Sequence, residues 1–151
     1  MCRSCLLFLC ICVLCLRAAA QTPEDSVKTV VKALFDAMRL SDSSLISVCF
    51  TRDGLLQSLD ERSQPIKVRT DSIGMFAHII SALPVGAADE RPSFDVVRVN
   101  GNLAMVWAPY QFYYKGSFHH CGVDSFQLVR IGGVWKIQYI IDTEHRQGCS
   151  S

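Results

Sequence analysis

The residues best able to do chemistry in this sequence gather between Tyr113 and Asp124, in the stretch YYKGSFHHCGVD. This stretch combines phenol, imidazole, thiol and carboxyl groups. A carboxyl group beside an imidazole in an apolar cavity can act as a general acid or base, and a tyrosine hydroxyl can stabilise an oxyanion. The first question is therefore which of these side chains share one face of the structure.

Three long strands joined by two tight turns must position these residues. Alternating apolar residues, bounded by the dipeptides KG and GG, are typical of hairpins with two-residue turns. The predicted strands are 103–114, 117–131 and 134–142. Such turns fix the register of the strands, and the register decides which side chains point inward.

This register predicts that Tyr113 faces Phe118 and that the pairs continue in step along both hairpins. One inward face then combines polar groups with aromatic walls. The predicted ligand-binding residues are Trp107, Gln111, Tyr113, His120, Asp124, Phe126 and Tyr139. The opposite face is predicted to carry Tyr110, Tyr114, His119, Cys121, Gln127 and Asp142.

Asp124 and His120 are the candidates for a catalytic base, and Tyr113 is the candidate oxyanion donor. Burial among apolar side chains disfavours an ionised carboxylate unless a donor compensates for it. In the structural alternative, Asp124 accepts a hydrogen bond from the Trp107 indole and His120 is a satisfied core histidine.

The adjacent histidines His119 and His120 do not predict a metal site. Neighbouring residues of a strand face opposite sides of the sheet, so the two rings are not expected to chelate one ion. Three inward ligands would require His120, Asp124 and His145 to converge. The sequence has no phosphate-binding glycine loop, no dinucleotide fingerprint and no G-x-S-x-G element, so we predict neither a metal nor a cofactor.

The N-terminus has the plan of a secretory signal peptide. An arginine precedes an apolar run over 6–16, and three alanines follow, which predicts residues 1–20 as the signal peptide. The apolar run is too short for a stable membrane anchor. Residues 21–151 are therefore expected to form a single exported domain, periplasmic or secreted.

Removal of this leader changes the charge and the cysteine count. It takes two arginines, no acidic residue and five of the eight cysteines, so the mature net charge is −1. No basic field remains for nucleic acid or an anionic membrane. Cys49 lies in an apolar run and is predicted to be buried, whereas Cys121 and Cys149 either form a disulfide or remain free thiols.

Helical periodicity precedes the strands. Thr22 is a candidate cap for a helix that continues to residue 39, because apolar residues recur there at helical spacing. The other expected elements are a helix within 41–50, strands at 52–59 and 65–70, a helix over about 70–83, a loop over 84–92 and a strand at 94–99. This order predicts an α+β fold, with N-terminal helices packed on a highly curved antiparallel sheet.

The segment NGNLAMVWAPYQFYYKGSFHHCGVDSFQLVRIGGVWKIQYIIDTEHRQGC, residues 100–149, resembles the final strands of small exported bacterial members of the nuclear transport factor 2-like superfamily. The looser resemblance extends back to Thr22. It implies a cone-shaped α+β barrel with a ligand-sized pocket at its mouth. The superfamily includes ketosteroid isomerase, scytalone dehydratase and polyketide cyclases of the SnoaL type, and also binding and scaffolding domains.

Three functions are consistent with this resemblance. The first is an exported domain that binds a small apolar or aromatic molecule without demonstrable catalysis. The second is a cofactor-independent isomerase, dehydratase or cyclase that uses Asp124 or His120 as general base. The third is a homodimeric association module that pairs through the outer face of the sheet. The fold by itself does not choose among them.

Overall fold

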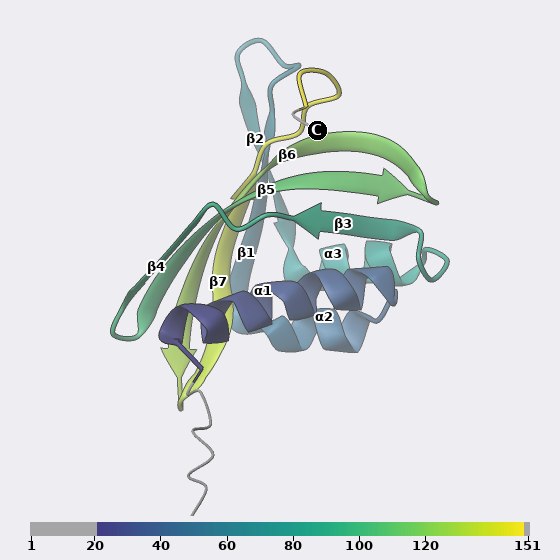
Figure 1. The fold of residues 1–151 in the computed structure, drawn as a ribbon. Coiled ribbons are helices and arrows are strands. Elements are labelled where there is room, and N and C mark those ends of the chain that lie inside the picture. Colours follow the sequence, from purple (N-terminus) through teal and green to yellow (C-terminus); the bar gives the residue numbers. More distant parts are fainter. Residues whose placement is uncertain (1–20, 150–151) are drawn as a thin grey trace, which may run out of the picture.

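A computed structural model describes residues 21–149 of the chain. The predicted signal peptide, 1–20, lies outside the described residues. Three helices pack on the concave side of a curved seven-stranded sheet (Figure 1). The predicted α+β class is thus confirmed. Within the described residues, no helix is both long enough and apolar enough to cross a membrane.

The helices are α1 (Pro23–Arg39), α2 (Ser43–Cys49) and α3 (Ile73–Ser81). The hydroxyl of Thr22 caps α1, as predicted, by accepting a hydrogen bond from a backbone amide of the first turn at 3.0 Å. Ser72 caps α3 in the same way, so this helix starts slightly later than the sequence predicted. The caps satisfy amide groups that a helix leaves without an internal partner.

The seven strands follow the order β2-β1-β7-β6-β5-β3, with β4 also paired to β5. Their bounds are β1 (Phe50–Asp60), β2 (Lys67–Ser72), β3 (Ala88–Pro92), β4 (Val96–Asn100), β5 (Leu103–Tyr114), β6 (Ser117–Ile131) and β7 (Val134–Asp142). β1 and β7 run parallel and the other pairs are antiparallel, so the sheet is mixed rather than wholly antiparallel. β3 replaces part of the predicted loop. It lies at the sheet edge, where a proline is tolerated.

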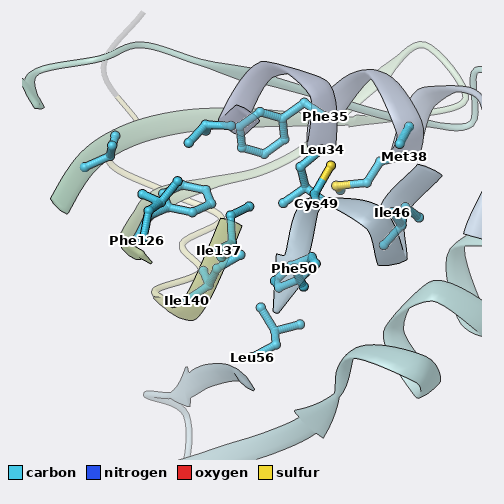
Figure 2. Packing of buried hydrophobic residues seen from close by; sticks show 14 of the residues in the cluster. Leu34, Phe35, Met38, Ile46, Cys49, Phe50, Leu56, Phe126, Ile137 and Ile140 are labelled. Atoms are coloured by element: carbon cyan, nitrogen blue, oxygen red, sulfur yellow. The ribbon is translucent and has the colours of Figure 1, made fainter. Parts of the chain in front are cut away.

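The apolar core lies between α1 and the lower parts of β6 and β7. Phe126 is fully buried, and its ring meets the ring of Phe35 edge-on with centroids 6.1 Å apart. Leu128 and Ile137 are also fully buried beside it. Figure 2 shows Phe35 of α1 close to Phe126 and Ile137 of the sheet. Each such side chain contributes about 1.5–3 kcal/mol through removal of apolar surface from water.

A β-bulge in the first long hairpin overturns most of the predicted register. The turn itself is as predicted, and Tyr113 pairs with Phe118. The next pair joins Phe112 to His120, which leaves His119 as an extra residue of β6. One extra residue moves every later side chain of the hairpin to the opposite face of the sheet.

A second bulge shifts the other hairpin. Leu128 pairs with Ile137, as the sequence predicted, but Gln127 rather than Phe126 then pairs with Tyr139. The extra residue in β7 is Gln138. After Gln138, the inward residues of β7 are Ile140 and Asp142. The sequence predicted Asp142 on the opposite face.

Candidate functional site

Three of the predicted pocket residues belong to the outer face of the sheet. Trp107 is 44 % exposed and pairs with Ser125 instead of Asp124. The hydroxyl of Tyr113 donates a hydrogen bond to Gln111 Oε1 at 3.0 Å. The predicted inward orientation of Trp107, Gln111 and Tyr113 is therefore wrong, and with it the oxyanion role of Tyr113. The cause is the bulge at His119.

Two further predicted pocket residues, Tyr139 and Phe126, line neither of two cavities found among residues 21–149, whereas Gln111 lines the second of these cavities. Tyr139 is turned by the second bulge, and its hydroxyl donates a hydrogen bond to Gln57 Oε1 at 2.7 Å. Phe126 points inward as predicted, but it is fully buried in the core. His120 and Asp124 are the remaining two, and both lie on the inward face. His120 lines a cavity, and Asp124 lies behind its wall.

This cavity has a volume of about 870 Å³ and lies between the β1–β2 hairpin and the C-terminal segment 144–147. Figure 1 shows that the hairpin and this segment project from the same end of the sheet. The lining is mostly charged or polar, and its aromatic rings are those of Tyr110, His120 and His145. The lining residues are Ser58, Leu59, Asp60, Glu61, Arg62, Lys67, Val68, Arg69, Tyr110, His120, Asp142, Glu144, His145, Arg146 and Gln147.

The C-terminal segment is fixed over β6 by covalent and backbone contacts. A disulfide joins Cys121 to Cys149, whose Cα atoms are 5.9 Å apart. His145 and Cys121 exchange two backbone hydrogen bonds of 2.9 and 2.7 Å. These contacts continue the pairing of β6 beyond the end of β7 and form one wall of the cavity.

Gly122 allows this close approach. A Cβ atom at this position would lie 1.9 Å from the carbonyl oxygen of Thr143. The same carbonyl accepts a hydrogen bond of 2.9 Å from the hydroxyl of Tyr110. Tyr110 is 5 % exposed, although the sequence placed it on the outer face. A glycine is thus required here by space rather than by a special backbone angle.

Three carboxyl groups gather behind and beside the cavity. Asp124 pairs with Asp142 on the neighbouring strand, and its side chain hydrogen-bonds that of Glu90 on β3. Asp124 is 5 % exposed. Asp124 Oδ2 and Asp142 Oδ1 are buried and find no hydrogen-bond partner among the described residues, 21–149. Since an unpartnered buried polar atom costs about 1–3 kcal/mol, this carboxyl cluster (Glu90, Asp124 and Asp142) needs an explanation beyond stability.

Burial raises the pKa of all three carboxyl groups. Burial, followed by the negative charge of Glu90, raises the pKa of Asp124 well above its usual range. Burial also raises the pKa of Glu90 to about 7, although a hydrogen bond from Asp124 opposes the shift. The pKa of Asp142 is raised, again mainly by burial, while a hydrogen bond with Ser58 lowers it. The carboxyl cluster can therefore donate or accept a proton near neutrality.

Tyr110 and His120, two of the aromatic residues of the cavity, are expected to be uncharged at neutral pH. Burial and the neighbouring carboxyl groups raise the pKa of the Tyr110 hydroxyl. Burial lowers the pKa of His120, and the negative charge of Glu144 only partly opposes it. His120 stacks on Phe112 with ring centroids 4.9 Å apart. A neutral imidazole and a phenol thus complete the uncharged part of the lining.

Comparison with solved structures identifies the architecture. An NTF2-like protein of unknown function from Shewanella baltica is 14 % identical, with a TM-score of 0.66 over 81 % of this chain and 93 % of that one. An NTF2-like protein from Cytophaga hutchinsonii is 16 % identical, with a TM-score of 0.65 over 82 % and 99 % of the two chains. The chain has the nuclear transport factor 2-like fold. A Nostoc punctiforme protein of unknown function, described as having a cystatin-like fold, is 13 % identical and has a TM-score of 0.65 over 83 % and 95 %.

The comparisons establish the fold of this chain and leave its activity open. No protein-family model matches the sequence, and no curated protein matches it either. Because the similar structures share at most 16 % identity in these alignments, they establish the fold and carry no site residue over. The chemistry must therefore be argued from the cavity itself.

Sequence reasoning missed three of the residues that build this site in the NTF2-like fold. Glu90 lies in a segment predicted to be a loop, and Tyr110 and Asp142 were predicted on the outer face. One signal was present for Tyr110. Small residues alternate at Ala104 and Ala108 of the same strand, which suits a face covered by helices better than a face open to solvent. No comparable signal points to Glu90.

Proposed function

We propose that this chain is a small-molecule-binding domain whose ligand occupies the cavity between the β1–β2 hairpin and the C-terminal segment. The observation that carries the proposal is a cavity of about 870 Å³ whose polar wall includes the carboxyl group of Asp142. Asp142 Oδ1 is itself buried, so a hydrogen-bond donor of a ligand would contact the part of this carboxyl group that faces the cavity. The volume falls within the range of small-molecule sites in proteins.

The chemistry of the lining defines the class of ligand. The cavity wall carries four acidic residues and four lysines or arginines, together with two histidines. Charges of both signs favour a zwitterion or an uncharged molecule rich in hydrogen-bonding groups. This proposal replaces the apolar or aromatic ligand predicted from the sequence, because Trp107, Tyr113 and Tyr139 do not line the cavity.

Thermal-shift measurements with two compound sets test this assignment. One set holds amino acids, sugars and nucleosides, and the other holds apolar aromatic compounds of similar size. We expect stabilisation by members of the polar set only, and a loss of about tenfold in affinity in Asp142→Asn, equivalent to about 1.4 kcal/mol. Trp107→Ala on the outer face is the matched control and should bind normally. Stabilisation by the aromatic set, or loss of binding in the control alone, would contradict the proposal.

A proton-transfer enzyme without a cofactor is the alternative that the carboxyl cluster favours. Asp142 would contact the substrate, and Asp124 would supply or store the proton from behind, because Asp124 does not line the cavity. His120 remains a candidate base, since it lines the cavity and its lowered pKa keeps it neutral at pH 7. Turnover of a bound ligand that survives in both Asp142→Asn and His120→Ala would rule out this role.

Export and self-association also stay proposals. Export is supported by the Cys121–Cys149 disulfide, because disulfides persist in oxidising compartments. Association is supported by an exposed apolar surface on the outer face of the sheet, where Trp107 is 44 % and Leu103 is 52 % exposed. Detection of the processed chain outside the cytoplasm tests the first proposal. Light scattering of wild type and Trp107→Lys tests the second, with a monomer in both cases counting against a homodimer.

A further inference from the structure

The β-bulge at His119 places two neighbouring histidines on the same side of β6. His119 and His120 both contact side chains on one face of β5, with their ring centroids 6.0 and 4.9 Å from that of Phe112. In a regular strand the two rings would face opposite sides, which is why the sequence did not predict a shared ligand site. The bulge removes this objection.

The two imidazole rings point a nitrogen at one common place. His119 Nδ1 and His120 Nδ1 are 2.7 Å apart, so one of them must donate a proton to the lone pair of the other. A cation that replaces this proton would meet a lone pair from each ring. The two nitrogens of a tetrahedral Zn²⁺ site lie roughly 3.4 Å apart, given Zn–N bonds of about 2.0–2.1 Å. An increase of the distance between the two Nδ1 atoms from 2.7 Å to roughly 3.4 Å is therefore sufficient for both to bind one Zn²⁺ ion.

A carboxylate completes the group. The ligand atoms of His119, His120 and Glu144 all lie within 4.8 Å of one another. His119 and Glu144 are exposed and His120 is half-buried, so solvent can reach the place where the atoms converge. Cys121, the next residue in the chain, is held in a disulfide and offers no thiolate. Two imidazoles and one carboxylate form the donor set that suits borderline divalent metals such as Zn²⁺, Ni²⁺ and Cu²⁺.

We propose that His119 Nδ1, His120 Nδ1 and a Glu144 carboxylate oxygen form a binding site for a divalent transition metal at the wall of the polar cavity. His120 and Glu144 both line that cavity. The bound ion would keep open coordination positions for water or for a ligand in the cavity. Metal binding can be measured without a small-molecule ligand. Failure of the metal proposal is therefore distinguishable from failure of the proposed small-molecule function.

Calorimetric titration of the untagged, oxidised protein with ZnCl₂ in a buffer without reductant tests the proposal. We expect one Zn²⁺ per chain, with no comparable binding of Mg²⁺ or Ca²⁺. His119→Ala, His120→Ala and Glu144→Gln should each weaken binding about tenfold or more, because even indirect support of a metal ligand is worth 10–100-fold. His78→Ala, an exposed histidine on α3, is the matched control and should bind like the wild type.

Two further measurements keep the test decisive. Glu144→Gln changes one exposed side chain, so a normal circular dichroism spectrum and melting temperature would show that its loss of affinity is local. Paramagnetic resonance of the Cu²⁺-loaded protein should show two nitrogen ligands in the wild type and one in His119→Ala. The proposal fails if 1 mM Zn²⁺ does not bind, or if binding survives in the His119/His120 double variant. It also fails if binding is lost only in His145→Ala. The ring nitrogen Nδ1 of His145 lies 3.1 Å from Glu61, so this result would indicate a different metal site.

Discussion

The inner face of β6 and β7 consists of two regions that differ in chemistry although they share the same strands. In the lower region, Phe126, Leu128 and Ile137 are fully buried in the core, and the ring of Phe126 contacts Phe35 of α1. In the upper region, the inward residues include Asp124 and Asp142, whose carboxyl groups are partly unsatisfied. The two regions meet between Asp124 and Phe126, which are consecutive inward residues of β6.

This difference separates the part of the sheet that stabilises the fold from the part to which we assign the proposed ligand site. Apolar side chains in the lower region stabilise the fold through surface removed from water. Unsatisfied carboxyl oxygens in the upper region cost stability, and natural sequences concentrate such costs at functional sites. The two regions should therefore respond differently to mutation and to pH.

The largest effect is expected for Phe126→Ala in the lower region. Deletion of this fully buried ring leaves a cavity under α1 and should reduce the free energy of unfolding by about 4 kcal/mol. Chemical denaturation measures the change, and Phe118→Ala on the exposed part of β6 is the control. A loss below about 1 kcal/mol would show that the lower region is not the main source of stability.

A somewhat smaller effect is expected for Gly122→Ala in the upper region. The new Cβ would lie 1.9 Å from a backbone carbonyl oxygen, so the C-terminal segment must move away from β6. We expect a loss of about 3 kcal/mol from this displacement. Gly74→Ala is the control, because no atom of the part of the chain that the structure describes lies within 4 Å of the added Cβ there. Equal stability of the two variants would contradict the close approach described above.

The smallest effect, a dependence of stability on pH, should also come from the upper region. The pKa of Glu90 is raised to about 7 in the folded state, so its contribution is fully present below its ordinary pKa and is lost as pH rises through 7. Between pH 5 and pH 8 the free energy of unfolding should fall by about 2 kcal/mol, since one pKa unit corresponds to about 1.36 kcal/mol and Glu90 is not fully buried.

Two variants separate the carboxyl cluster from other titrating groups. Glu90→Gln should flatten the pH dependence of the unfolding free energy, whereas Asp53→Asn at an exposed position should leave it unchanged. Asp124→Asn should also flatten it while keeping a hydrogen-bond donor for Glu90. A rise in stability between pH 5 and pH 8 in the wild type would refute the assigned burial of this cluster.

Local signals in the sequence predict the elements of this fold well, because turns and periodicity depend on neighbouring residues. The last three strands have the predicted bounds, and the turn residue Lys115 adopts the positive φ that such a turn requires. The faces of those strands were predicted less well. The bulges at His119 and Gln138 depend on how distant strands fit together, and no residue type marks either position.

The candidate site was predicted only where a residue kept its face through both bulges. His120 and Asp124 come from the part of β6 whose own alternation was read correctly, so both point inward as expected. Their partners come from strands whose register relative to β6 was wrong, and Glu90 comes from a strand that was not predicted. Which residues surround a given side chain is decided by pairing across the sheet, and a single sequence contains little of that information.

The parallel pairing of β1 with β7 has a consequence for how the chain must fold. The two strands are joined by pairs such as Leu56 with Ile140, and the hydroxyl of Thr51 donates a hydrogen bond to Gln138, 87 residues further along the chain. Until β7 has been synthesised, β1 retains an unpaired edge that can recruit another chain. Contacts between such distant residues also slow folding, because the intervening loop must be closed first. Hairpins of neighbouring strands such as β1–β2 and β5–β6 can pair locally, but the sheet is completed only in a late step that joins the two ends of the domain.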